Sequence, residues 1–374
     1  MKTRNYPIAL LLLLCFPFVC SAQNDPTEMI YPDQDWHVAT PERQGVSSVK
    51  LSEAIRFLES LPVSDKANEL FIARRGRVIH AGPNVDKMHG VWSCTKSFTS
   101  TALALLIADG KCSLDSAAAK WDPRLAESYP DVTLKQFATM TSGYRAIGDE
   151  PQGSYRHGPS NTPFDPAPLP LFAPGSTYAY WDSAMNEFAN VLTRIANEPL
   201  DELFRRRVAQ PIGIGPEAWR WGDFGEINGV RVNGGAGNHA KNVYISAREF
   251  ARFGHLMLNQ GSWEGSQLLD PNWISQAVVS QVTVGETHSD SMADGRGTYG
   301  LNWWVNGVGA NGNRKWAGVP VDTYSASGYN NNDLFVIPAW QMVVVRLGLD
   351  QSDHEITDDE QATLLRMIGE AILR

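Results

Sequence analysis

A serine and a lysine with the spacing of a catalytic pair stand at the start of an apolar run. Ser93 and Lys96 are three residues apart, and the run that follows them ends at Gly110. On a helix, residues three apart share a face, one turn from each other. A serine hydroxyl becomes a strong nucleophile only when a base takes its proton, and a neutral lysine amine in an apolar site can act as that base. The spacing therefore predicts Ser93 as a nucleophile and Lys96 as its base.

The expected place of this pair, at the beginning of a helix, suits the same chemistry. Free backbone N–H groups and the positive end of the helix dipole lie there, and both stabilise developing negative charge. A second copy of the pattern runs from Ser47 to Lys50 and precedes the apolar residue Leu51. We interpret this copy as the N-cap of another helix, not as a second nucleophile.

The elements that must position Ser93 alternate between strands and helices. A β-hairpin is expected over 69–82, so the helix after Ser93 enters from the edge of a sheet. The other expected elements are helices at about 48–61, 132–138, 183–197, 199–208, 246–258 and 358–373, and strands at about 299–305, 334–338 and 342–347. The hairpin at 69–82 and the adjacent strands at 334–347, with helices between them, predict an α/β (α+β) chain with an antiparallel sheet flanked by helices.

The middle of the chain differs from its two ends in composition and in expected secondary structure. Residues from about 114 to 237 are mostly helical and are expected to form an inserted lobe, while about 41–113 and 238–374 form the α/β lobe. A segment rich in Pro, Gly and Asp runs from 148 to 174. Long loops inside a compact unit are usually lids or binding loops, so we expect this one to shape the substrate pocket.

The first residues indicate export. Lys2 and Arg4 precede an apolar run, and small residues follow it up to Ala22. This pattern predicts a signal peptide over 1–22, and thus a secreted or periplasmic protein. Residues 23–40 are expected to be an extended, exposed lead-in to a domain over 41–374. No later stretch has the length of a membrane span, so no stable membrane anchor is expected.

Charge and metal-binding residues exclude several classes of function. The formal net charge is −9, and no block of basic residues stands out, which argues against nucleic acid as a partner. The histidines show no metal-ligand spacing, so neither a metal nor another cofactor is expected. Cys94 and Cys112 would lie at opposite ends of the helix after Ser93, too far apart to bridge. Both are expected to be free thiols.

Several short motifs accompany the segment 92–98 in a fixed order. They are Asp-Gly-Lys at 109–111 with Leu-Asp at 114–115, Thr-Met-Thr-Ser-Gly at 139–143, Pro-Gly-Ser-Thr-Tyr-Ala-Tyr at 174–180, Pro-Ile-Gly at 211–213, the run 248–254 and the run 299–304. Together they resemble the serine β-lactamase and penicillin-binding-protein superfamily, closest to the branch of class C β-lactamases, related esterases, D-aminopeptidases and amidases. The resemblance covers nearly all of the mature chain and implies a β-lactamase-like two-lobed fold with Ser93 and Lys96 in the catalytic roles.

The second element of that superfamily is a Tyr-x-Asn motif, and here it is altered. Tyr180 stands in the position of the tyrosine, and Asp182 replaces the asparagine. The resemblance implies that Tyr180 works with Lys96 as general base and returns a proton to the leaving group. A carboxylate beside Lys96 would hold the lysine charged, and we interpret this as favouring an ionised Tyr180 as the base.

The third element, Lys-Thr-Gly or His-x-Gly, is altered as well. The matching residues are Ala326, Ser327 and Gly328, so the usual cation is missing. The resemblance implies that these three residues border the substrate. It also implies that the backbone N–H groups of Ser93 and Tyr329 form the oxyanion hole.

The sequence thus predicts a secreted serine hydrolase that forms an acyl-enzyme on a small-molecule carboxylic ester or amide. Two alternatives stay open. One is a β-lactamase or D-amino-acid peptidase. The other is a non-catalytic receptor that keeps the fold, suggested by the two altered motifs.

Overall fold

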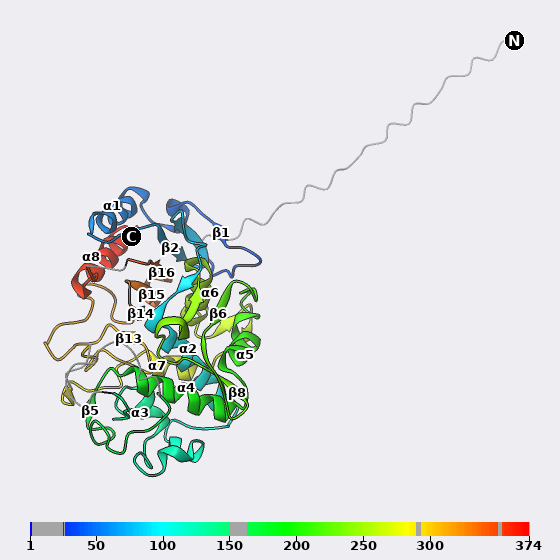
Figure 1. The fold of residues 1–374 in the computed structure, drawn as a ribbon. Helices are drawn as coiled ribbons and strands as arrows, with labels where there is room; N and C mark the ends of the chain where they lie inside the picture. Colours follow the sequence, from blue (N-terminus) through cyan, green and yellow to red (C-terminus); the bar gives the residue numbers. More distant parts are fainter. Residues whose placement is uncertain (2–24, 26, 150–162, 289–292, 351–353, 374) are drawn as a thin grey trace.

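A computed structural model describes residues 1, 25, 27–149, 163–288, 293–350 and 354–373. Nearly all of the predicted signal peptide and the middle of the predicted loop 148–174 lie outside the described residues. The chain folds around a seven-stranded sheet with the strand order β1-β3-β2-β16-β15-β14-β13 (Figure 1). The bounds are β1 His37–Val38, β3 Arg77–Ala81, β2 Glu69–Arg74, β16 Met342–Leu347, β15 Asn332–Ile337, β14 Tyr324–Gly328 and β13 Trp304–Val305. Neighbours are antiparallel except for β1 and β3.

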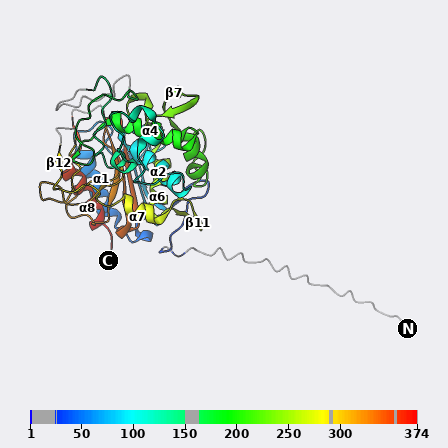
Figure 2. The same ribbon diagram turned by 90° about the horizontal axis from the view of Figure 1, so that it is seen from below.

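Helices cover both faces of this sheet. On one face lie α1 (Ser48–Ser60) and α8 (Asp358–Glu370), and on the other lie α2 (Thr95–Ala108) and α6 (Ala247–Leu258), as the two views agree (Figures 1 and 2). Every residue of β2, β15 and β16 is buried, as expected for strands between two helical layers. The sheet therefore has its core on both sides, and the ends of β14 and α2 meet at its edge.

A second group of helices lies against the side of α2 that faces away from the sheet (Figure 1). Its main helix, α4 (Asp182–Ala196), packs on α2, on α3 (Leu134–Ala138) and on α5 (Leu200–Phe204), which continues as a π-helix over Arg205–Ala209. The remaining elements are β4 His89–Gly90, β5 Thr177–Tyr178, β6 Trp219–Trp221, β7 Asp223–Ile227, β8 Val230–Asn233, β9 Val243–Ile245, β10 Ser262–Trp263, β11 Ser266–Gln267, α7 Pro271–Ala277 and β12 Thr287–His288.

Most expected elements are present, and their ends follow from side-chain caps. Thr133 caps α3 through a reciprocal pair of hydrogen bonds with Gln136, and the Ser246 side chain caps α6. Ser47 accepts a hydrogen bond from the Lys50 N–H at the start of α1, which confirms that this copy of the Ser-x-x-Lys pattern caps a helix.

Two expectations about local structure were wrong. Residues 299–305 are not one strand, because the chain turns back at Asn302 (φ 60°) and the Gly300 N–H bonds the Trp303 carbonyl, leaving only Trp304–Val305 paired with β14. The lead-in 23–40 is not wholly exposed either. Trp36 is 4% exposed, and β1 adds to the sheet beside β3, because a large indole gains more by packing against the core than by facing water.

Candidate active site

Ser93 lies in a short turn between β4 and α2. This turn is a 3-10 helix, η2 (Trp92–Cys94), and α2 itself begins only at Thr95, later than the sequence predicted. The residue before the serine, Trp92, has a φ of 50°, a left-handed conformation that bulky side chains rarely adopt. Such strained residues persist where the surrounding structure holds them, and they gather at functional sites.

Lys96 is buried next to this serine. Its side chain is 2% exposed, and its ammonium nitrogen lies 2.9 Å from Ser93 Oγ and 2.8 Å from the carbonyl oxygen of Ala236. A third oxygen, Asp182 Oδ1, lies 2.8 Å away. Lys96 thus donates two hydrogen bonds and forms an ion pair with Asp182. The predicted pair is therefore in contact, with Lys96 held in a fixed position.

Tyr180 lies over the lysine. Its ring centroid is 4.6 Å from Lys96 Nζ, and its side chain stacks on Trp304 at 6.0 Å. Burial raises the pKa of Tyr180 well above its usual value, the charge of Asp182 raises it further, and a hydrogen bond with Ser93 acts in the opposite direction. The interpretation that Asp182 favours an ionised Tyr180 is therefore wrong, because two negative charges in a buried site repel each other.

Asp182 begins α4 and is 2% exposed. One carboxylate oxygen contacts Lys96, and the other accepts a short hydrogen bond from the Asn238 side chain. Asn238 in turn lies within 3.4 Å of Asn186, whose side chain also holds the backbone N–H of Ala236. A buried charge needs both a partner and hydrogen bonds, and Asp182 has both.

The sequence analysis missed Asn238 and the carbonyl of Ala236. Both lie in the stretch 234–238, which reads Gly-Gly-Ala-Gly-Asn, and its three glycines were the available signal, because glycines let a backbone approach a site closely. No pattern in the sequence pointed to the asparagine itself.

The strand β14 runs past the nucleophile at very short range. A Cβ added to Gly328 would lie 3.0 Å from the Ser93 nitrogen and 2.2 Å from the Val91 carbonyl oxygen. Only glycine fits there. Ala326, two residues earlier, is buried on the same side of the strand, and its carbonyl lies 3.5 Å from the Cys94 sulfur. The structure thus brings the altered third motif to the nucleophile turn, with a methyl group at position 326.

Ser327 points to the other side of the sheet. Its hydroxyl lies 3.0 Å from Ser325 Oγ and also hydrogen-bonds the buried carboxyl of Asp333. Burial raises the pKa of Asp333 to about 6, although Ser327 and the cation of Arg346 oppose that shift. The Ser327 side chain is therefore hydrogen-bonded within the sheet, so only the backbone groups of Ser327 can contact a substrate.

The backbone direction along β14 follows from one hydrogen bond. The Asn306 N–H donates to the Thr323 carbonyl, on the side where β13 lies. Backbone groups of residues two apart point the same way along a strand, so those of Ser325, Ser327 and Tyr329 share this side. Because β13 pairs only as far as Ser325, the edge beyond it is open toward Ser93.

The other side chains considered from sequence do not join Ser93. Cys94 is fully buried, which raises the pKa of its thiol, and its sulfur lies 3.2 Å from the Asn332 carbonyl. Cys94 and Cys112 are both free, as predicted. Arg145, a possible substitute for the missing cation, donates to the Leu169 carbonyl, and Arg156 lies outside the described residues.

The residues that the structure describes contain no group of three or more His, Cys, Asp or Glu side chains placed to hold a metal ion. None of their helices combines the length and the apolar character of a membrane span.

Comparison with known proteins decides the family. The profile of the beta-lactamase family matches residues 69–365. The chain belongs to this family. The matched range contains the Ser93 turn, β14 and the other strands of the sheet except β1, and solved structures share the fold, so the predicted resemblance and the predicted α/β, β-lactamase-like fold are confirmed.

Solved structures of the same fold carry several different names. A putative 6-aminohexanoate-dimer hydrolase from Bacillus anthracis has a TM-score of 0.62 at 18% identity, covering 91% of this chain and 88% of that one. A family VIII carboxylesterase has a TM-score of 0.63 at 16% identity, covering 88% and 99%. A beta-lactamase/D-alanine carboxypeptidase from Pseudomonas syringae has a TM-score of 0.58 at 17% identity, covering 86% and 98%. At these identities the likeness shows the fold alone.

Proposed function

We propose that this chain is a serine hydrolase that cleaves a carboxylic ester or amide through an acyl-enzyme on Ser93. The observation that carries the proposal is the 2.9 Å contact between Ser93 Oγ and Lys96 Nζ, within a buried group that also holds Tyr180 and Asp182. A nucleophile, a base in reach of it and a third group that orients the base form the usual arrangement for covalent catalysis.

The proton path starts at the ion pair. As an ammonium group, Lys96 donates to Ser93 and Ala236 and pairs with Asp182, so it must release a proton before it can accept the proton of Ser93. Asp182 Oδ1, 2.8 Å away, is the acceptor that we propose. Lys96 then takes the Ser93 proton while Oγ bonds to the substrate carbonyl carbon. The carbonyl electron pair moves to oxygen, giving a tetrahedral oxyanion.

The oxyanion and the leaving group need separate partners. The N–H groups of Ser93 and Tyr329 are the proposed donors to the oxyanion, supported by the close approach of Gly328 to the Ser93 nitrogen. Tyr180 stays protonated because its pKa is raised, so it is the proposed proton donor to the leaving oxygen or nitrogen. It regains its proton from Lys96. Water then attacks the acyl carbon while Lys96 takes a proton from it, and the Ser93 Oγ–carbon bond breaks as that proton passes to Oγ, which releases the acid.

Residue 326 bears on the substrate class. With alanine there, position 326 supplies no cation to face a substrate carboxylate, so neutral esters and amides are the favoured substrates. The name carboxylesterase, given to a protein of the same fold, agrees with this choice. Export, directed by the predicted signal peptide at 1–22, is part of the proposal and would place the enzyme in the periplasm or outside the cell.

The test is covalent labelling with a fluorophosphonate, read as intact mass and by peptide mapping. One adduct at Ser93 is expected in the wild type and none in Ser93→Ala. Ser47→Ala is the matched control, since Ser47 has the same spacing to a lysine but caps α1. Labelling of Ser47, or unchanged labelling of Ser93→Ala, would contradict the assignment. Labelling without turnover of nitrophenyl acetate would favour a receptor.

A further inference from the structure

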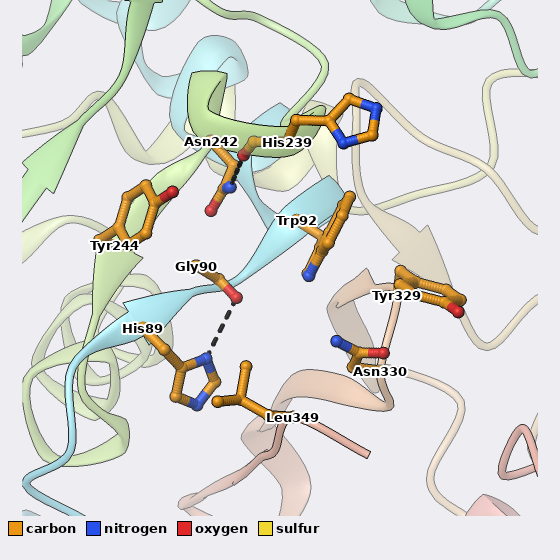
Figure 3. A pocket seen from close by; sticks show the side chains of 9 residues that line it. All are labelled: His89, Gly90, Trp92, His239, Asn242, Tyr244, Tyr329, Asn330 and Leu349. Carbon is orange, nitrogen blue, oxygen red and sulfur yellow. Dashed lines mark hydrogen bonds between the residues drawn. The ribbon is translucent and has the colours of Figure 1, made fainter. Parts of the chain in front are cut away.

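A cavity of about 510 Å³ opens beside the nucleophile turn (Figure 3). Four segments distant in the sequence contribute to it: β4, the region 239–244, the turn after β14 and the chain after β16. Three aromatic rings stand edge to face along one wall, with Trp92 5.3 Å from Tyr329 and 5.8 Å from His239. Tyr244 stands opposite, and the guanidinium of Arg220 covers one face of its ring at 3.4 Å.

This cavity shares its wall with the proposed active site. Trp92 is the residue before Ser93, and Tyr329 follows Gly328, where an added Cβ would lie 3.0 Å from the Ser93 nitrogen. A group in the cavity would therefore lie beside Tyr329, which supplies one proposed oxyanion donor, and beside the neighbour of Ser93, which supplies the other. An occupant attached to the reacting carbonyl fits this place better than an independent ligand does.

Two buried amides in the lining have unused hydrogen-bonding capacity. Asn242 is 2% exposed and Asn330 is 6% exposed, and the side-chain oxygen of each has no hydrogen-bond partner among the described residues. The Asn242 nitrogen donates to the His239 carbonyl, which fixes the amide so that its oxygen faces the space between Tyr244 and Trp92 (Figure 3). A buried acceptor without a partner is costly, so it indicates a donor that arrives with a ligand.

The backbone is adapted to this amide. A Cβ added to Gly90 would lie 2.4 Å from Asn242 Oδ1, so any other residue would displace the amide. His89 offers no polar group to a ligand, because its Nδ1 lies 3.1 Å from the Gly90 carbonyl and its Nε2 lies 2.7 Å from the Glu69 carboxylate. No Asp, Glu, Lys or Arg occurs among the described residues that line the cavity. Its chemistry is aromatic and uncharged.

We propose that this cavity binds a planar, uncharged aromatic group of the substrate that carries an N–H or O–H donor for Asn242. The proposal rests on the proposed function, since it assigns part of the substrate of the same site. Flat rings fit between edge-to-face aromatic walls, whereas a charged group would find no counter-ion there. The substrate class is thus an aryl ester or aryl amide.

Calorimetry on Ser93→Ala tests binding without turnover. Benzamide, which is planar, neutral and carries a donor, is expected to bind more tightly than cyclohexanecarboxamide, which is puckered. Tyr244→Ala is expected to weaken benzamide binding by about three- to tenfold, the usual scale of one aromatic contact. Asn242→Leu is expected to weaken it by a similar factor, about that of one hydrogen bond, but to leave N,N-dimethylbenzamide, which lacks the donor, unaffected. Asn272→Ala, exposed on α7, is the control for each titration.

Turnover then tells which part of the substrate enters the cavity. If the leaving group does, Tyr244→Ala lowers the ratio of kcat/KM for phenyl acetate to that for trifluoroethyl acetate. If the acyl group enters the cavity, Tyr244→Ala instead lowers the ratio of kcat/KM for ethyl benzoate to that for ethyl cyclohexanecarboxylate. Equal binding of benzamide and cyclohexanecarboxamide, or no binding of either, overturns the proposal. Failure of Ser93 labelling would overturn the proposed function separately, because calorimetry on Ser93→Ala does not depend on catalysis.

Discussion

Lys96 Nζ lies 2.8 Å from Asp182 Oδ1, and both side chains are almost completely buried. The pair differs from the Tyr-x-Asn arrangement that the sequence resembles, because a carboxylate replaces a neutral amide. In a neutral site the lysine must lose its proton to solvent before it can act as a base. In this site the carboxylate can accept that proton locally, and the total charge of the pair does not change.

Asp182→Asn tests this difference through kcat/KM for ester hydrolysis. In the wild type the carboxylate is the proposed acceptor of the Lys96 proton, and the amide of the variant cannot take that role. The value of kcat/KM is therefore expected to fall by about 10²-fold or more, the usual scale of general acid–base contributions. The measurement is hydrolysis of nitrophenyl acetate. Asp201→Asn, in a separate ion pair with Arg231, is the control. Unchanged turnover in Asp182→Asn would show that the Lys96 proton leaves by another route.

Tyr180→Phe is expected to lower kcat by about 10²-fold or more, the usual scale of a general acid. The loss should be larger for an amide than for a nitrophenyl ester, because an amine needs protonation to leave. Tyr324→Phe is a matched control: this tyrosine is also buried, and its hydroxyl has no hydrogen-bond partner among the described residues. Equal losses for the two substrates would mean that another group protonates the leaving atom.

The alanine at 326 predicts a preference between substrates. A carboxylate in a water-poor site without a counter-ion is costly, so a chromogenic cephalosporin should have a lower kcat/KM than nitrophenyl acetate in the same preparation. The negative charge of Asp182 nearby adds to this effect. If kcat/KM for the cephalosporin is higher by tenfold or more, the β-lactamase alternative replaces the proposed esterase function.

Asp333 predicts a pH-dependent stability. Burial raises the pKa of this carboxyl to about 6, so the folded protein holds a proton that the unfolded chain, near pKa 3.8, releases. Stability is therefore lost as pH rises from about 4 to 6. The side chain that replaces Asp333 in Asp333→Asn cannot ionise. The free energy of unfolding of this variant, relative to that of the wild type, should therefore rise by up to about 3 kcal/mol across that window and stay level at higher pH. Urea unfolding from pH 4 to 8 measures the difference, with the exposed Asp359→Asn in parallel. A difference that does not change with pH would contradict the prediction.

Much of the architecture was predictable because it depends on local patterns. The hairpin β2–β3, the hairpin β15–β16 and the capped helices α1, α3 and α6 all follow from periodicity and end signals in the sequence. The strand at 299–305 was overpredicted because aromatic residues favour strands, whereas the left-handed Asn302 that reverses the chain has no strong sequence signal.

The site was predictable where one motif supplies both partners. Ser93 and Lys96 lie close together because three residues separate them, and Tyr180 and Asp182 could be placed from the resemblance. The contribution of Asn238 and the effect of burial on Tyr180 depend on tertiary packing, so residue types alone did not reveal them. The cavity beside Trp92 was missed for the same reason, since its walls come from four separate segments.

The contact of Gly328 with the Ser93 turn leaves no room between β14 and the start of α2. A shift of a few tenths of an ångström between sheet and helix would therefore alter the distance between the nucleophile and the strand edge before any core contact is lost. Loss of activity on heating or in denaturant should accordingly precede loss of secondary structure. Under the proposed function, ester turnover would thus report how tightly the sheet and α2 are joined.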